Sequence, residues 1–202
     1  MMKIRTTALI SSALTATLLL AGCSAGTAPG GVNSGENSAP SSAESGSFNA
    51  ADQMFAIMMI PHHQQAVEMA DLVLEKADID ERVSELAQQI KAAQDPEISI
   101  MEGWLTGWGI DYDSSETSGM AGMGHGDGMM SDADMDDLQQ AEGSEASRLF
   151  LEQMIEHHEG AIVMAQAQID EGEFPAAIEL ATVIVSAQTE EIVTMQAILD
   201  TL

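Results

Sequence analysis

The feature that most constrains this fold is a repeat that divides the chain into two similar halves. The first copy reads Met-Ile-Pro-His-His at residues 59–63, and the second reads Met-Ile-Glu-His-His at residues 154–158. After a loop the likeness resumes between residues 86–101 and 180–195, with one residue fewer in the second loop. A duplicated helical unit cannot bury its apolar face alone, so we expect the core to form where the two halves face each other.

Hydrophobic periodicity predicts two helices in each half. The predicted fold class is therefore all-α, a four-helix bundle of two duplicated helical hairpins joined by a long linker rich in Met and Gly. Composition agrees, because aromatic residues make up 3% of the chain and Met numbers 15, which suits closely packed helices. The predicted long helices cover residues 51–77, 79–104, 145–169 and 174–199, and a short helix covers residues 131–141.

Local signals mark the ends of these helices. Ser131 and Asp134 have the spacing of a capping box, and Ser144 is expected to cap the third long helix. Pro175 suits the first turn of the fourth. Pro61 falls within the first predicted helix, where it would kink the helix; alternatively, it begins a new helix.

The N-terminal segment has the order of an export signal. Lys3 and Arg5 are followed by an apolar stretch at residues 8–20 and by the lipobox Leu-Ala-Gly-Cys, which ends at Cys23. We expect a lipoprotein signal peptide at residues 1–22, cleavage before Cys23 and lipidation of its thiol, for example with palmitate. An uncleaved anchor helix is the alternative.

This signal sets the expected domain organisation. Residues 23–49 would be a lipidated flexible tether, because they are mostly small and polar, and residues 50–202 would be the folded domain. The protein would be extracytoplasmic and lipid-anchored to the cell membrane. Because Cys23 is the only cysteine, its acylation would leave Met thioethers as the only sulfur ligands.

Charge excludes one class of partner. The formal net charge is −27, with 33 acidic and 6 basic residues, whereas binding to nucleic acid phosphates needs Lys and Arg. We therefore expect no nucleic acid partner. An acidic surface would instead attract cations weakly.

Helical spacing places the His-His pairs on apolar stripes. The stripes contain Phe55, Met59, His62, Ala66 and Met69 in the first half, and Phe150, Met154, His157, Ala161 and Met164 in the second. His62 and His157 lie nearer the centre of each stripe, whereas His63 and His158 flank it. The alanines leave room next to the rings.

Polar residues also occur on the core-facing rows of the second and fourth long helices. They are Gln94 and Glu97 in the first half and Gln188 and Glu191 in the second. Burial without a partner costs roughly 1–3 kcal/mol per group, so these side chains need partners. Imidazole N–H groups would supply them, as in the outer shell of a metal-binding histidine.

The spacing between Met and His indicates which metal to expect. Di-iron bundles use Glu-x-x-His, and here Met59 and Met154 replace that Glu, three residues before His62 and His157. A soft thioether shifts the preference away from Fe and Mn, and Met with His favours Cu(I), while His can also hold Cu(II). A Met stripe alone is usually core and one His pair is usually structural; their coincidence in both halves favours a copper site.

The linker offers a further set of donors. Met120, Met123, His125, Met129 and Met130 lie in a stretch rich in Gly, where packing in a core would not explain Met. Such a segment could capture copper and pass it on. The alternative is an accident of composition.

These motifs resemble the family catalogued as domain of unknown function 305, over roughly residues 50 to 200. The resemblance is carried by residues 59–63, 94–105 and 150–161. It implies a ferritin-like fold and a link to copper binding and resistance outside the cytoplasm. It also implies a ligand set of Met59, His62, His63, Met69, Met101, Met154, His157, His158, Met164 and Met195. Because Ser147 stands where the first half has Asp52, the two sites need not be equivalent.

Three functions follow from these observations. The leading hypothesis is a lipoprotein that binds copper for buffering, delivery or resistance, with a copper-handling protein as a possible partner. A metal-dependent oxidoreductase of the ferritin-like type would need an open coordination position and a substrate pocket. A surface interaction module would use the His pairs structurally. No Cys nucleophile, Ser-His-Asp set or phosphate loop stands out, which favours a role other than catalysis.

Overall fold

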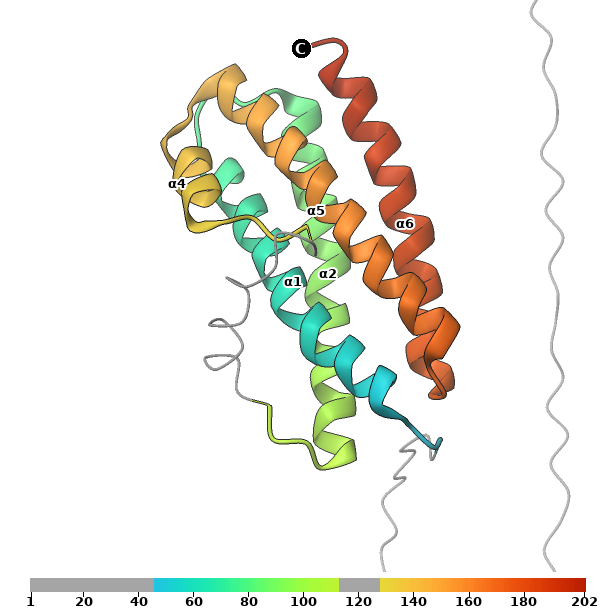
Figure 1. The fold of residues 1–202 in the computed structure, drawn as a ribbon. Helices are drawn as coiled ribbons and strands as arrows, with labels where there is room; N and C mark the ends of the chain where they lie inside the picture. The colour runs from blue at the N-terminus through green and yellow to red at the C-terminus, as the bar shows by residue number, and fades with distance from the viewer. Residues whose placement is uncertain (1–45, 113–127) are drawn as a thin grey trace, which may run out of the picture. The chain divides into compact units, whose positions relative to one another are not determined.

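The computed structural model describes residues 46–112 and 128–202, and within these ranges the chain is all α, without a strand. The long helices are α1 (Ala50–Leu74), α2 (Glu81–Trp108), α5 (Gly143–Glu171) and α6 (Pro175–Leu199), and α4 (Asp132–Gln140) is short (Figure 1). None of these described helices is long and apolar enough to cross a membrane. The predicted signal peptide, Cys23, Met120, Met123 and His125 lie outside the described residues.

The long helices pack as two pairs, α1 with α2 and α5 with α6. The pairs meet mainly through α1 and α5, and α4 packs against these same two helices. Asp52 near the start of α1 contacts Gln168 near the end of α5, while His62, further along α1, contacts His157, which comes earlier in α5. Helices α1 and α5 therefore run antiparallel (Figure 1). The predicted all-α class is confirmed.

Some predicted helix ends are wrong. Ser144 does not cap α5, because the chain turns earlier: Glu142 is extended, and its carbonyl already accepts a hydrogen bond from the N–H of Ala146. Helix α1 ends at Leu74 and not at residue 77, and α2 continues to Trp108 instead of ending at residue 104. Pro61 does not begin a new helix, since it lies inside α1.

Other local predictions are confirmed. Ser131 and Asp134 form a capping box at the start of α4, with each side chain bonded to the backbone of the other. Pro175 is in the first turn of α6. These signals could be read from the sequence because they depend on a few neighbouring residues.

The start of α6 is held by a residue from the other hairpin. The buried carboxylate of Asp52 in α1 accepts hydrogen bonds from the N–H groups of Glu173 and Phe174, at 3.1–3.2 Å. Gln168 of α5 donates its Nε2–H to the same carboxylate at 2.5 Å. These donors at a helix N-terminus are among the groups that have no partner within the helix.

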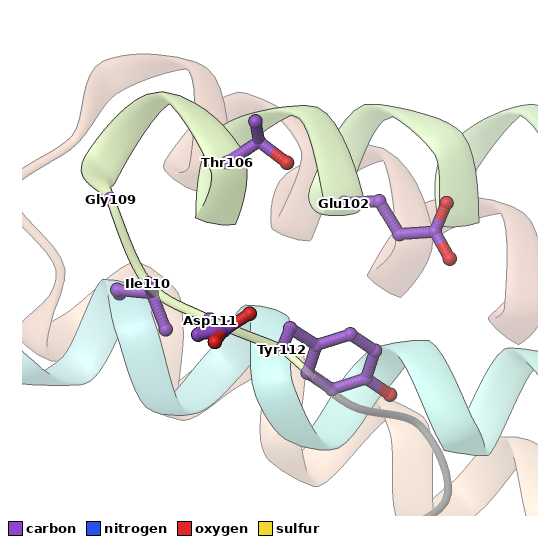
Figure 2. A pocket seen from close by; sticks show the side chains of 6 residues that line it. All are labelled: Glu102, Thr106, Gly109, Ile110, Asp111 and Tyr112. Carbon is purple, nitrogen blue, oxygen red and sulfur yellow. The ribbon is translucent and has the colours of Figure 1, made fainter.

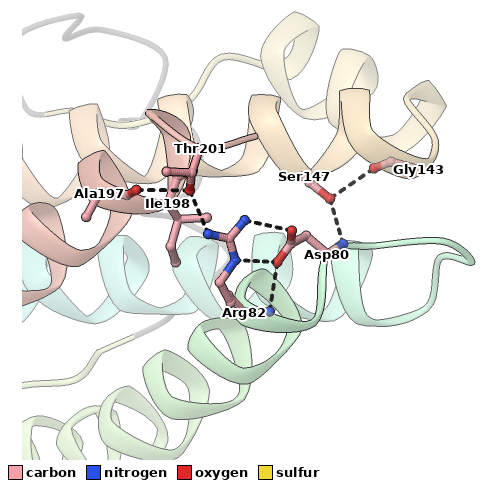
Figure 3. A network of polar contacts seen from close by, with 7 residues as sticks. All are labelled: Asp80, Arg82, Gly143, Ser147, Ala197, Ile198 and Thr201. Atoms are coloured by element: carbon pink, nitrogen blue, oxygen red, sulfur yellow. Dashed lines mark hydrogen bonds and ion pairs between the residues drawn. The ribbon is translucent and has the colours of Figure 1, made fainter.

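The equivalent position of the second half does the same for α2 (Figure 3). Ser147 of α5 accepts a hydrogen bond from the N–H of Asp80, the N-cap residue of α2, at 3.1 Å and donates one to the carbonyl of Gly143 at 3.0 Å. In the following turn, Arg82 donates to the hydroxyl of Thr201 after α6, at 2.7 Å. Each hairpin therefore fixes the start of the other hairpin's second helix. Asp52 and Ser147 differ in chemistry, but both accept a hydrogen bond from the backbone there.

Asp52→Asn should lower the free energy of unfolding by about 2 kcal/mol near neutral pH, because an amide presents N–H donors to the N–H groups of α6. Burial raises the pKa of Asp52, but the hydrogen bonds from Asn49, Gln168, Phe174 and Glu173 outweigh it and lower the pKa below its ordinary value of 3.8. The ionised form therefore stabilises the fold above that value, and this stabilisation is lost as pH falls through the native pKa.

Urea unfolding at a series of pH values measures this effect, with Ser147→Ala as the uncharged comparison. The difference in the free energy of unfolding between wild type and Asp52→Asn should become smaller in acid. The effect of Ser147→Ala on the free energy of unfolding should stay nearly constant. A difference between wild type and Asp52→Asn that is the same at every pH would contradict the role assigned to the carboxylate.

Candidate metal centre

A band of polar side chains, which we call the polar layer, crosses the middle of the four long helices. Its members are His62, His63, Gln94, Glu97, His157, His158, Gln188 and Glu191. The four imidazoles and two amides are buried, and the two carboxylates are partly exposed. Direct contacts join the four histidines and two glutamates in three pairs. Gln94 and Gln188 are each one turn before the glutamate of their helix.

The polar layer divides the apolar core into two clusters. On α1, residues 55–60 belong to one cluster and residues 66–73 to the other, with the histidines between them. The first, which we call the Phe55 cluster, includes Phe55, Met59, Met101, Ala161 and Ile184. The second, the Phe150 cluster, includes Ala66, Met69, Ile90, Phe150, Met154 and Met195.

His62 and His157 meet where α1 crosses α5. Their ring centroids are 3.7 Å apart, and the ring planes are tilted by 41°. The side chains beside them, Ala66 and Ala161, are small and fully buried. The inward orientation expected for this pair is what the structure shows.

The flanking histidines are held by carboxylates. Nε2 of His63 lies 2.7 Å from Oε2 of Glu97, and Nε2 of His158 lies 2.7 Å from Oε2 of Glu191. An ionised carboxylate can only accept, so Nε2 carries the proton and Nδ1 keeps its lone pair. Among the described residues, neither of these Nδ1 atoms has a hydrogen-bond partner. In the neutral form of each ring with this hydrogen bond, Nδ1 is the atom with a lone pair available for a metal.

Several other buried atoms of the polar layer lack a partner within the described ranges. They include both ring nitrogens of His157, both amide atoms of Gln94 and Oε1 of Gln188. Burial, followed by the nearby imidazoles of His62, His158 and His63, keeps the pKa of His157 well below its ordinary value of 6.5. Its ring is therefore neutral at neutral pH, which is the form that ligates a metal.

Methionines lie on both sides of the polar layer. Met59, Met69, Met101, Met154 and Met195 are fully buried, and Met164 packs against the Phe55 cluster with partial exposure. No three His, Cys, Asp or Glu side chains of the described ranges are grouped so that they could hold a metal ion. Besides Glu97 and Glu191, the potential metal donors near the polar layer are the thioethers of the two flanking clusters.

The described end of the linker lies against the same turns. Gly128, with a φ of +72°, approaches α5 so closely that a Cβ would lie 2.6 Å from the carbonyl oxygen of Glu156 and 2.9 Å from Cα of Gly160. Met130 exchanges two backbone hydrogen bonds with the side chain of Gln65 on α1. The expectation that core packing does not explain the linker methionines is wrong for Met130, because it is buried in the Phe150 cluster. Met129 is partly buried beside it.

A separate pocket of about 600 Å³ lies at the end of α2 (Figure 2). It is lined by Glu102, Thr106, Gly109, Ile110, Asp111 and Tyr112. None of these residues belongs to the polar layer or to the predicted ligand set. Sequence reasoning did not indicate this pocket, because it depends on the path of the chain after α2 ends at Trp108.

The family model for the domain of unknown function DUF305 matches residues 52–199, and the chain therefore belongs to the DUF305 family. This range includes the whole polar layer. Comparison with curated proteins gives no match.

Several solved structures are similar to most of this chain. A DUF305 protein from Streptomyces coelicolor, regarded as secreted, is 37% identical, with 75% of this chain and 93% of that chain covered and a TM-score of 0.67. A DUF305 fragment from Deinococcus radiodurans is 32% identical, with 76% and 98% covered and a TM-score of 0.64. CopM in its Cu(I)-bound form is 31% identical, with 74% and 96% covered and a TM-score of 0.60. CopM has also been solved with Cu(II) and with Ag bound.

His157→Leu should stabilise the metal-free protein by about 1–3 kcal/mol. It replaces two buried ring nitrogens, which have no hydrogen-bond partner among the described residues, with an apolar side chain of similar volume. Denaturant unfolding in the presence of a chelator measures this change. Met154→Leu, one turn earlier on α5, is the control and should change stability by less than about 1.5 kcal/mol. A clear loss of stability in His157→Leu would show that the ring nitrogens are satisfied in the metal-free fold.

Proposed function

We propose that this DUF305 protein is an extracytoplasmic copper-binding lipoprotein that serves copper buffering, delivery or resistance. One observation carries the proposal: the buried imidazoles of His63, His157 and His158, with ring nitrogens that have no partner among the described residues, lie between two groups of buried methionines. The proposed ligands are Met59, His62, His63, Met69, Met101, Met154, His157, His158, Met164 and Met195.

The donor chemistry supports copper over other metals. Thioether sulfur is soft and favours Cu(I), while neutral imidazole suits both Cu(I) and Cu(II). Glu97 and Glu191 would orient the rings of His63 and His158 and raise their basicity through the 2.7 Å contacts. The copper-bound forms of CopM, 31% identical to this chain, are consistent with this proposal.

We further propose that the duplicated hairpins form a bundle of the ferritin type in which Met replaces the iron-binding Glu. The long helices and their pairing support this assignment. In this arrangement Met59 and Met154 replace the hard Glu ligands of a di-iron centre. Each lies one turn before the paired histidines.

The anchored location is part of the same proposal. The lipobox at Cys23 supports lipidation, and the Streptomyces relative is regarded as secreted. A protein held at the outer face of a membrane would encounter copper before the cytoplasm does. It could then buffer the metal or deliver it to a copper-handling protein partner.

Competition against a Cu(I) chelator tests the metal site in the purified full chain. His62→Ala with His157→Ala should weaken binding by more than the roughly 10–100-fold that loss of an outer partner costs, because two candidate ligands are removed. Glu68→Gln with Glu159→Gln, which changes exposed carboxylates on the same helices, is the matched control and should bind as the wild type does. Unchanged affinity in the His double variant would rule out the proposed centre.

Cys23→Ala tests the anchor. The thiol that carries the lipid is lost, so labelled palmitate should no longer be incorporated and the protein should leave the membrane fraction. Cell fractionation with an antibody to the helical domain measures this, and Ser24→Ala is the control. Retention of the Cys23→Ala variant in the membrane would favour an uncleaved anchor helix.

A further inference from the structure

A short segment covers one side of the bundle. Residues 128–140, which we call the strap, include α4 and pack against α1 and α5 (Figure 1). Side chains of these two helices hold the backbone of the strap. Gln65 of α1 accepts a hydrogen bond from the N–H of Met130 at 2.7 Å and donates one to its carbonyl at 2.9 Å. Gln153 of α5 donates to the carbonyl of Asp134 at 2.9 Å. The strap therefore bridges the two hairpins.

Two of the positions under the strap are equivalent in the repeat. Gln65 is three residues after His62, and Gly160 is three residues after His157. Gln65 holds the strap with its side chain. Gly160 makes room for it, because a Cβ on Gly128 would lie only 2.9 Å from Cα of Gly160. Three residues are about one helical turn, so the strap crosses the seam between α1 and α5 about one turn from the point where the two imidazole rings meet.

The strap has little stability of its own. Helix α4 is nine residues long, and isolated helices shorter than about 12–15 residues are marginal in water. Met130 and Leu138 of the strap are buried in the Phe150 cluster. The long helices, however, also pack directly on one another, as α1 with α2, α5 with α6 and α1 with α5. Elements with few contacts open most easily, so the strap can detach while the four long helices stay paired.

His62 and His157 are buried, with 1% and 0% of their surface exposed, so an ion from solvent reaches them only if part of the protein moves. We propose that the strap is a closure over the seam between α1 and α5, and that its detachment sets the rate at which solvent and ions reach these two rings. The inference rests on the proposed copper-binding function, for which it assigns the step that controls uptake and release. A closure that detaches equally readily from the free and the loaded protein changes both rates alike and leaves the affinity as it is.

Two variants loosen the strap by different means. Gly128→Ala should displace it, because the added Cβ would lie 2.6 Å from the carbonyl oxygen of Glu156, and a helix backbone cannot move aside as a side chain can. Gly109→Ala is the matched control, since Gly109 has nearly the same φ, +74° against +72°, but no described atom lies within 4 Å of the added Cβ. Gln65→Ala removes both hydrogen bonds to the strap. Gln64→Ala, its control, removes the neighbouring amide of α1 and leaves both bonds in place.

The first measurement is the rate at which diethyl pyrocarbonate, a reagent for neutral imidazoles, modifies the metal-free full chain, mapped by mass spectrometry. Both strap variants should raise the rates at His62 and His157 by about tenfold or more, because lost contacts increase the fraction of protein with the strap detached. The controls should keep the wild-type rates, and so should hydrogen exchange in α2 and α6. Wild-type modification rates in both strap variants would overturn the closure and indicate access from the side of Glu97 and Glu191. Faster hydrogen exchange throughout α2 and α6 would show that the strap supports the fold, which also overturns the closure.

The second measurement is the transfer of Cu(I) to and from a chelator. Both strap variants should speed uptake and release by similar factors, so that the affinity stays within about twofold of wild type. A changed affinity with one of the two rates unaltered would show that the strap takes part in binding itself, and would overturn the closure. Absence of tight Cu(I) binding in the wild type would overturn the proposed function, whereas the histidine modification would still decide whether the strap is a closure.

Discussion

Helices α1 and α5 run antiparallel and meet where the ring of His62 packs against the ring of His157, with centroids 3.7 Å apart. Because this crossing is the main contact between the two hairpins, it sets which residues of one half face which residues of the other. It places the start of each first helix beside the start of the opposite second helix. The contacts of His63 with Glu97 and of His158 with Glu191, in contrast, form within each hairpin.

The polar layer lies where a bundle of this kind would gain most from apolar packing. Burial of Gln94 and His157 without hydrogen-bond partners among the described residues opposes folding by roughly 1–3 kcal/mol per group. The two apolar clusters on either side, both lined by Met and Ala, offset this cost. Unsatisfied polar groups in a core are commonly found at functional sites, and under the proposed function a bound metal ion would take up ring-nitrogen lone pairs that have no partner among the described residues.

Much of this arrangement could be predicted from the sequence, since helical periodicity and the repeat identify the stripes that carry His62 and His157. Signals confined to a few neighbouring residues, such as the capping box at Ser131, could be predicted equally well. The pairing of Glu97 with His63 and the burial of Met130 could not be predicted in detail, because both depend on how separate segments pack. The prediction that Ser144 caps the third long helix is wrong for a related reason. Ser144 has the side chain of a cap residue, but the helix begins before it.

The reciprocal bonds from Asp52 to the start of α6 and from Ser147 to the start of α2 bear on the history of the molecule. At the start of each hairpin's second helix, backbone N–H groups find an acceptor side chain in the other hairpin. Two copies of a single hairpin would make the same exchange as a homodimer. The present chain therefore has the contacts expected if such a dimer was joined by gene fusion, after which one copy of the shared position could become Asp and the other Ser. In this view the Met-rich linker is the segment that fusion added.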